Sequence, residues 1–364
     1  MEIAPVRGLA TISGTAGLTI ALRALAPAKC GVGVPATICP NVVAAILAAG
    51  CRPFFLDIER ETFGLDPAAL QRDIGALGAV IAVHALGQPC QIADIARICS
   101  DHDRLLLEDC AQADGASLEG RAVGSWGDAG IFSYGRGKII DLGHGGLLTA
   151  NSGGVWSSLR QESAKLRAGA DPAVALDAAS VMNVAYRDLY NARRRSGSSA
   201  SATEFIRSMT ALVQAPLAPA QESKHTEIRS ARQEKLAKTV AARRRKSDLY
   251  RQALAGIPGL AFAPQTATGA PWRFNILLAT QVRDQLLDIM LADRMKVSSW
   301  HPDIRPYLPA SCYDSGKIVN ASWYSNAVLN LWVDDETSEQ EILDTARNIR
   351  CRLETADLTP ADGD

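Results

Sequence analysis

The chain has 364 residues, of which 47% are hydrophobic and 21% are charged, as in a globular protein. Its 38 Lys and Arg residues balance its 39 Asp and Glu residues, which argues against a nucleic-acid or anionic-membrane surface as the main binding feature. The eight cysteines are scattered without a C-x-x-C pair, so neither a disulfide framework nor a cysteine metal site is expected. The first residues lack a signal-peptide pattern, and no apolar run reaches the roughly 20 residues that span a bilayer. We therefore expect a cytoplasmic protein, and its length predicts two domains.

From Thr15 to Asn151, helical patterns alternate with short apolar runs. Such alternation predicts an α/β fold, with a mostly parallel sheet covered by helices. Ligands in these sheets bind beyond the carboxyl ends of the strands. The expected helices are Thr15–Leu25, Pro40–Ala49 and Ile92–Ser100, and the expected strands are Pro53–Asp57, Ala79–His84, Leu105–Asp109 and Ala129–Ser133.

The second half of the chain has a different character. The segment 192–202 is basic and rich in Ser and Gly, which predicts a mobile loop. We expect a large domain over 1–220 that contains this loop, followed over 221–364 by a long helix and a smaller C-terminal α/β domain. The expected elements are helices Ser223–Ala255, Asp284–Ala292 and Ser338–Leu353, and strands Trp272–Leu278 and Val328–Trp332.

The phrase Ser13-Gly14-Thr15-Ala16 opens the first predicted helix. The amides of a helix's first turn attract anions, and small or hydroxyl residues let a phosphate approach closely. A simple helix cap is the alternative interpretation, and the phrase alone favours it.

An acid and a lysine point to more specific chemistry. Asp109 ends an apolar strand, where a carboxylate needs a partner because burying it alone is costly. Lys138 follows Gly135-Arg136-Gly137, and the glycines permit an unusual turn. Together they are the parts that hold pyridoxal 5′-phosphate (PLP): the lysine attaches the cofactor, and the carboxylate keeps its ring nitrogen protonated. The alternatives are a structural acid and a solvated charge. His84 is either a pocket residue or a satisfied interior histidine.

Five phrases in this order resemble the DegT/DnrJ/StrS family of sugar aminotransferases, which are PLP enzymes of fold type I. Ordered agreement of this kind is more specific than any single motif. The resemblance implies the fold type I architecture, with a large domain built on a seven-stranded, mostly parallel sheet and a smaller C-terminal domain. The phrases are SGTA (13–16), PFFLDIERETFGLDPAAL (53–70), VHALGQPCQIADI (83–95), EDCAQADGA (108–116) and GSWGDAGIFSYGRGKIIDLGHGG (124–146).

The resemblance also implies roles for individual residues. Lys138 would carry the internal aldimine, Asp109 would pair with the pyridine nitrogen, and Gln112 would contact the region of the ring's 3-hydroxyl. Relatives with histidine in place of this lysine are dehydratases, so Lys138 favours transamination. The phosphate would be held by Gly14, Thr15, Ala16 and Ser133. No metal is implied.

Two of the chain's departures from the family concern the cofactor site. Thr37 or Cys39 stands where relatives carry an aromatic residue over the ring, so Cys39 and His84 are candidate ring or pocket contacts. The later Asn-Tyr-Arg phrase, through which a partner subunit reaches the phosphate, is not found.

The expected function is amination of a keto sugar, nucleotide-linked, with an amino-acid donor such as glutamate, in a homodimer. The alternatives are an aminotransferase for a cyclitol or another unusual ketone, a PLP lyase, and a PLP-binding protein without turnover.

Overall fold

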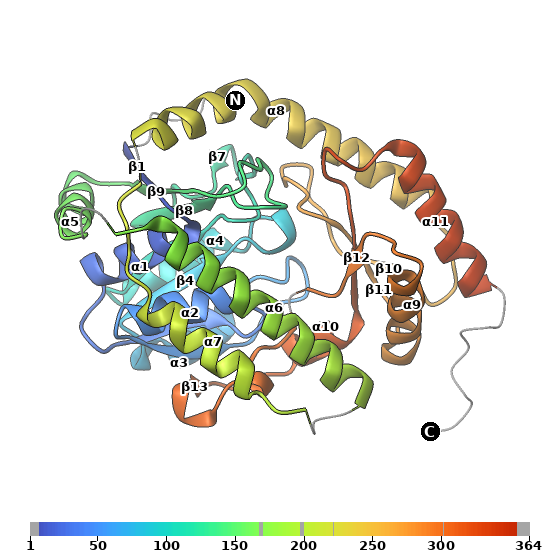
Figure 1. The fold of residues 1–364 in the computed structure, drawn as a ribbon, viewed down its shortest axis with the longest axis horizontal. Coiled ribbons are helices and arrows are strands. Elements are labelled where there is room, and N and C mark those ends of the chain that lie inside the picture. Colours follow the sequence, from blue (N-terminus) through green and yellow to red (C-terminus); the bar gives the residue numbers. More distant parts are fainter. Residues whose placement is uncertain (1–6, 167–169, 197–199, 221, 301, 355–364) are drawn as a thin grey trace.

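The computed structural model of the protein describes residues 7–166, 170–196, 200–220, 222–300 and 302–354. Within these ranges the chain forms two main β-sheets with helices packed against them (Figure 1). In the same part of the chain, every helix is too short or too polar to cross a membrane.

The larger sheet has eight strands in the order β1-β9-β8-β5-β4-β2-β3-β13. The six strands from β8 to β13 run parallel, and β9 pairs antiparallel with both β8 and β1. The predicted α/β fold with a mostly parallel sheet is therefore confirmed, with an eighth strand at its edge. The strands are β1 Arg7–Thr11, β2 Gly31–Pro35, β3 Arg52–Leu56, β4 Ala79–Val83, β5 Leu105–Asp109, β8 Ala129–Ser133, β9 Gly146–Ala150 and β13 Asp314–Ser315.

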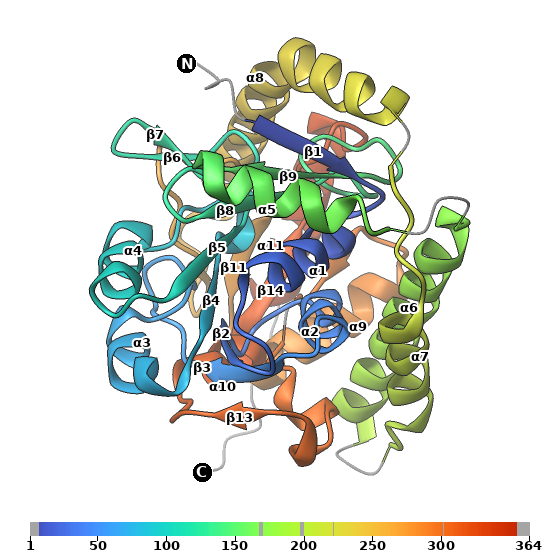
Figure 2. The same cartoon turned by 90° about the vertical axis from the view of Figure 1, so that its left-hand side faces the viewer.

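Both faces of this sheet are buried, because neighbouring residues on its central strands enter different cores. Val80 and Leu106 pack with α3 and α4, whereas Ile81 and Leu107 pack with α1 and α2. Figure 2 shows these two pairs of helices on opposite sides of the sheet. Helices α5, α6 and α7 add to the core on the side of α1. The helices are α1 Gly14–Leu25, α2 Pro40–Ala48, α3 Pro67–Asp73, α4 Ile92–Asp101, α5 Gly153–Ser163, α6 Pro172–Ser196 and α7 Thr203–Gln214.

The smaller sheet is antiparallel, in the order β10-β11-β14-β12. Helix α8 serves both sheets: its Leu236 and Val240 pack in the core of the large sheet, and its Tyr250 and Leu254 pack in the core of the small one. The domain boundary expected between 220 and 221 falls just before α8 and stays a prediction. The elements are α8 Glu222–Ala253, β10 Ala261–Phe262, β11 Phe274–Leu277, α9 Thr280–Ala292, β12 Val297–Ser298, β14 Val328–Leu331 and α11 Glu339–Glu354.

The second half of the chain returns to the large sheet through α10 (Asn320–Ala327) and β13. β13 pairs in parallel with β3. Directly after β3, the buried Asp57 accepts hydrogen bonds from the backbone N–H groups of Val319, Asn320 and Ala321, at the start of α10. This carboxylate is therefore one of the contacts that join the two halves.

The predicted helices and strands lie within a few residues of those observed, but the predicted loop over 192–202 is wrong in its first part. Residues 192–196 complete α6, and 197–199 lie outside the described residues. Two of the arginines here have partners on α9: Arg195 pairs with Asp288 at 3.2 Å, and Arg194, with only 4% of its side chain exposed, pairs with Asp288 at 2.5 Å and Asp284 at 3.6 Å. These ion pairs stabilise helix where composition indicates a loop.

The Asp57 contact generates a stability prediction. Asp57→Ala removes the acceptor of four backbone N–H groups, those of α10 and that of Ile58, so the free energy of unfolding falls by about 2 kcal/mol. The control is Asp66→Ala, which removes the cap of α3 on the surface and costs about 1 kcal/mol. Urea denaturation measures both, and equal losses would contradict the role of Asp57 in joining the halves.

Candidate active site

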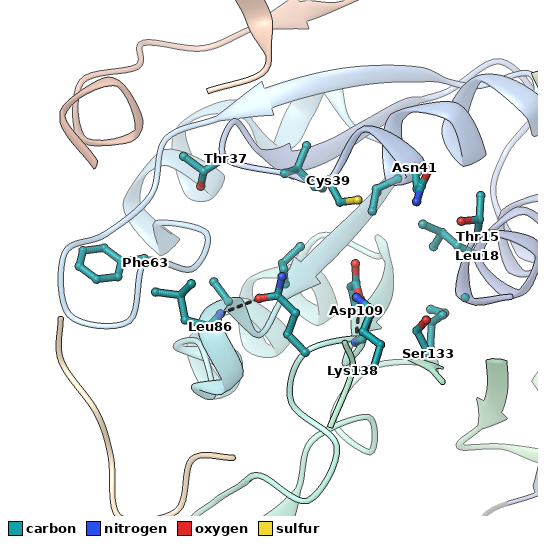
Figure 3. Close-up of a pocket in the computed structure, with 18 of the residues that line it drawn as sticks. Thr15, Leu18, Thr37, Cys39, Asn41, Phe63, Leu86, Asp109, Ser133 and Lys138 are labelled. Carbon is teal, nitrogen blue, oxygen red and sulfur yellow. Dashed lines mark hydrogen bonds between the residues drawn. The ribbon is translucent and has the colours of Figure 1, made fainter. Parts of the chain in front are cut away.

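Parallel strands end together at one edge of the large sheet, and their last residues face a common cavity. Val83, Asp109 and Ser133 stand at the carboxyl ends of β4, β5 and β8. The empty space at this edge, counted together with the part open to solvent, is about 840 Å³ (Figure 3). It lies where α/β sheets bind their ligands. Its lining residues are Gly14, Thr15, Leu18, Thr37, Ile38, Cys39, Asn41, Val42, Phe63, Val83, Ala85, Leu86, Asp109, Ala111, Gln112, Ile131, Ser133, Lys138 and Tyr324.

The N-terminus of α1 forms one end of the cavity. Gly14 and Thr15 line it, and the Ser133 hydroxyl group lies at the same end (Figure 3). A Cβ atom at Gly14 would lie 3.1 Å from the Ser133 Cβ, so glycine permits this close approach. First-turn amides and two hydroxyl groups make a suitable cradle for a phosphate.

Ala16 does not line this cavity. Its backbone N–H donates to the capping Ser13 Oγ at 3.1 Å, and the residue faces a different, smaller cavity. The helix cap and the cavity lining therefore use different residues of one turn, so a cap does not exclude an anion site here.

Asp109 faces the cavity from the end of β5. One carboxylate oxygen accepts a hydrogen bond from the Ala111 amide at 2.9 Å. Burial raises the pKa of the Asp109 carboxyl, while the Ala111 amide and the charge of Lys138 act in the opposite direction. A cationic ligand beside Asp109 would remove the cost of keeping this carboxylate ionised.

Glu108 points to the opposite face of the sheet, as strand alternation predicts. Its carboxylate is fully buried and accepts hydrogen bonds from the backbone amides of Gly124, Trp126 and Gly127. It is also 3.1 Å from His84 Nε2. Glu108 therefore organises the 124–127 turn and does not enter the cavity.

His84 is an interior histidine, because its side chain is fully buried and it is absent from the cavity wall. Its Nδ1 accepts the amide of Cys90 at 3.2 Å, which leaves Nε2 to donate to Glu108. Ligand atoms of His84, Glu108 and Cys110 lie within 4.8 Å of one another. Because Glu108 and His84 already make these hydrogen bonds, the cluster does not favour a metal ion.

Lys138 reaches the cavity from a turn that follows β8. Gly137 has a φ of 74°, in the left-handed region that glycine tolerates, and the Lys138 amide donates to the Gly135 carbonyl. Figure 3 shows the Lys138 side chain beside Asp109. A lysine and a carboxylate 29 positions apart in the sequence thus meet in one cavity.

Gln112 also lines the cavity, with its side chain fixed by a neighbouring loop. Its Oε1 accepts the amide of Leu86 at 2.8 Å. Leu86 has a φ of 58°, an unfavourable backbone conformation for a leucine, and the hydrogen bond helps to maintain it. Gln112 is therefore held in place before any ligand binds.

Thr37 and Cys39, one of which stands where family relatives carry an aromatic residue over the cofactor ring, both line the cavity. Cys39 precedes α2, and burial raises the pKa of its thiol despite the opposing charge of Lys138. This shared electrostatic influence agrees with Cys39, Asp109 and Lys138 facing one space.

Sequence reasoning missed two aromatic residues of the wall. Phe63 has a φ of 59°, and its ring centroid lies 4.8 Å from that of Tyr324 on α10. The Tyr324 hydroxyl donates to the Trp300 carbonyl at 3.3 Å. No local pattern brings Tyr324 here, since it arrives through the α10 contact with Asp57.

The sequence profile of the DegT/DnrJ/EryC1/StrS aminotransferase family matches residues 6–350. A GDP-perosamine synthase of Vibrio cholerae is 34% identical over 154 residues, which are 42% of this chain and 42% of that protein. An L-glutamine:2-deoxy-scyllo-inosose aminotransferase of Streptoalloteichus tenebrarius is 36% identical over 147 residues, covering 38% of this chain and 34% of that enzyme. The chain thus matches well under half the length of these relatives.

Among solved structures, DesI in the presence of its TDP-sugar product has a TM-score of 0.75. The two share 20% sequence identity, and the match covers 96% of this chain and 82% of DesI. At this identity the likeness establishes the fold, and it extends through the C-terminal half, where the sequence resemblance is weak. The profile match over nearly the whole chain settles the family: this protein belongs to the DegT/DnrJ/EryC1/StrS aminotransferases.

Proposed function

We propose that this protein is a PLP-dependent aminotransferase that converts a keto sugar, carried on a nucleotide, into an amino sugar with an amino acid such as glutamate as donor. The observation that carries the proposal is the meeting of Lys138, Asp109 and the phosphate cradle of Gly14, Thr15 and Ser133 in one cavity. Each of these groups has a counterpart on PLP: an aldehyde, a ring nitrogen and a phosphate.

The residues present fit the cofactor on chemical grounds. The first-turn amides of α1 and the hydroxyl groups of Thr15 and Ser133 suit a phosphate dianion. Asp109, whose burial disfavours its ionised form, gains a cationic partner in a protonated ring nitrogen. Bound PLP supplies an electron-withdrawing ring that stabilises negative charge on the substrate carbon.

The protein's own residues then perform the remaining tasks. The Lys138 amine would attach the cofactor and, once free, would move a proton between the substrate carbon and the cofactor carbon as general base and acid. Asp109 would hold its negative charge beside the ring nitrogen. Gln112, held by the Leu86 amide, keeps its side chain at the cavity wall. The apolar side chains of Leu86, Phe63 and others in the wall exclude water from these groups.

The relatives support a sugar as acceptor. One is named a GDP-perosamine synthase, and the DesI structure was obtained with a TDP-sugar product. A cyclitol ketone is the second candidate, because the relative from Streptoalloteichus tenebrarius is named for a scyllo-inosose substrate and L-glutamine as donor. Competition between nucleotide-linked keto sugars and inososes in an amination assay distinguishes the two.

The proposal includes a homodimer. α6 presents the exposed residues Val174, Val181 and Val184, which would be covered in an assembly. Sedimentation equilibrium at micromolar concentration is expected to give twice the chain mass, and a monomer that still attaches PLP would contradict this part.

We also propose a cytoplasmic location. Cys30 and Cys51 are free thiols, although their sulfur atoms are only 3.8 Å apart. Free thiols at this separation are typical of a reducing compartment. Fractionation of cells that produce the protein tests the location.

Lys138 provides the direct test of function. Borohydride treatment of the PLP-loaded protein should fix the cofactor to Lys138, as detected by peptide mass spectrometry, and Lys138→Arg should abolish this attachment. Adding L-glutamate to the wild type should convert bound PLP into pyridoxamine 5′-phosphate. In Lys138→Arg this conversion should fall about a thousandfold, as expected for loss of a general base.

Other outcomes would contradict the proposal in defined ways. Attachment without conversion by any amino donor would favour a lyase. Noncovalent binding of PLP without conversion would favour a PLP-binding protein. If the protein binds PLP neither covalently nor noncovalently, the aminotransferase, the lyase and the PLP-binding protein are all excluded.

Asp109 gives a second prediction, with opposite effects on stability and cofactor binding. Because burial raises its pKa in the folded protein, the ionised group opposes folding as pH rises through that value. Asp109→Asn should therefore raise the melting temperature of the cofactor-free protein at pH 7. This gain should shrink toward pH 4, where the carboxyl is increasingly protonated in both states. The same variant should gain less thermal stability from PLP than the wild type gains.

Asp114→Asn is the matched control, because Asp114 is buried but already paired with Arg232 at 2.9 Å and with the Tyr134 hydroxyl. It should lower the melting temperature without PLP, since it breaks an existing ion pair. Thermal unfolding by circular dichroism measures both variants. A lower melting temperature for cofactor-free Asp109→Asn would contradict the assigned cost of this carboxylate.

A further inference from the structure

The turn that carries Lys138 is held from outside by two residues of the second half of the chain. The indole Nε1 of Trp272 donates to the Gly137 carbonyl at 2.9 Å. The Arg243 guanidinium, on α8, donates through Nη2 to the Lys138 carbonyl at 3.0 Å. Consecutive carbonyl groups beside the reactive lysine thus accept hydrogen bonds from residues more than 100 positions away.

The turn itself supplies little regular structure. Residues 134–145 lie between β8 and β9, outside any helix or strand. Its local hydrogen bonds include one from the Lys138 amide to the Gly135 carbonyl, one from the Leu142 amide to the Tyr134 carbonyl, and those from the Gly137 and Gly143 amides to the Asp141 carboxylate. Glycines on both sides of Arg136 allow many backbone conformations. The donors to the Gly137 and Lys138 carbonyl groups come from outside the turn, so they add to what holds the Lys138 backbone.

Arg243 is an unusual donor for a purely structural contact. Its side chain is 2% exposed, and its contacts are carbonyl groups, those of Lys138, Trp272 and Pro271. Burial lowers the pKa of this guanidinium, and the opposing carboxylates of Asp334 and Asp335 act only at longer range. A buried cation bonded to neutral acceptors costs stability, which a role in placing the lysine explains.

The Trp272 indole is fixed in turn by its neighbours. The Arg273 guanidinium lies over the Trp272 ring at 4.7 Å and over the Trp332 ring at 4.2 Å. The Trp272 amide donates to the carbonyl of Leu86, the residue whose own amide binds Gln112. One chain of contacts therefore connects Gln112, the 84–87 loop, Trp272 and the lysine turn.

We propose that Trp272 and Arg243 are positioning residues, which hold the Gly137 and Lys138 carbonyl groups so that the Lys138 amine meets the cofactor aldehyde. The inference rests on the proposed function, because it needs Lys138 to attach PLP. Neither residue lines the cavity that holds Asp109 and the Lys138 side chain, so both act through Lys138.

The test compares Trp272→Phe, which keeps an aromatic ring but loses the N–H donor, with Arg243→Lys and Arg243→Met. The control is Arg245→Met, on the same helix, whose exposed side chain binds Glu339 at the surface. The readout is the fraction of PLP attached to Lys138 at equilibrium, from absorbance and from borohydride fixation. Trp272→Phe and Arg243→Met should each lower the attachment equilibrium constant about tenfold, the usual effect of one lost hydrogen bond. Arg243→Lys, which retains one donor, should lose less, and Arg245→Met should match the wild type.

A second set of variants, made in protein that lacks the Lys138 amine, separates a positioning role from a general disturbance of the site. In Lys138→Ala, noncovalent affinity for PLP should be the same with Trp272 or Phe at position 272, because the hydrogen bond acts through the lysine. If Trp272→Phe weakens this noncovalent affinity as much as it weakens attachment, or leaves attachment unchanged, the positioning role is overturned. If the wild type itself fails to attach PLP at Lys138, the proposed function fails first, and this outcome is distinct from the other two.

Discussion

The site depends on the alternation of side chains along β5. Glu108 and Asp109 are adjacent, so they point to opposite faces of the strand. Backbone amides of the 124–127 turn donate hydrogen bonds to Glu108. This turn leads into β8, which pairs with β5 and ends at Ser133, so it helps to fix the position of Ser133. With Glu108 fixed, Asp109 must face the cavity. Every other element of the site, from the N-terminus of α1 to the lysine turn, is arranged around that carboxylate.

The energetic pattern of the site supports a ligand-binding role. The Asp109 carboxyl is buried with a raised pKa, the Cys39 thiol behaves in the same way, and Leu86 and Phe63 have left-handed backbone conformations. The buried Asp109 carboxylate and the left-handed Leu86 and Phe63 are unfavourable in the free protein, and all three line one cavity. Unfavourable features that collect in one place are typical of functional sites, where the ligand compensates for them. By contrast, buried acids elsewhere, such as Asp114 and Asp57, have complete sets of partners.

Much of this organisation could be predicted from the sequence, because it is local. The apolar runs define β4, β5 and β8, and in parallel strands the carboxyl ends meet, so Asp109 and Ser133 share an edge. Of the residues predicted to hold a phosphate, Gly14 and Thr15 line the cavity, whereas Ala16 does not, and the Ala16 amide donates to the Ser13 cap. A lysine after a glycine-rich turn is by itself ambiguous, so the role of Lys138 was inferred from its combination with Asp109 and from the family resemblance.

What the sequence could not predict depends on distant contacts. Tyr324 reaches the cavity because Asp57 caps α10 across the two halves, and no local pattern indicates that pairing. The helical end of α6 looked like a loop from composition, yet ion pairs to α9 hold Arg194 in place. His84 was ambiguous for the same reason, because its partner Glu108 is 24 positions away. In each case, contacts with residues distant in the sequence determine the structure and outweigh the local sequence preference.

The most direct test of the central claim is a crystal structure of the protein soaked with PLP. The account predicts the phosphate against Gly14, Thr15 and Ser133, the ring nitrogen beside Asp109, and electron density continuous from the cofactor to Lys138 Nζ. Density for the phosphate at another helix, or a cavity that stays empty at saturating PLP, would contradict the assignment of this cavity as the cofactor site.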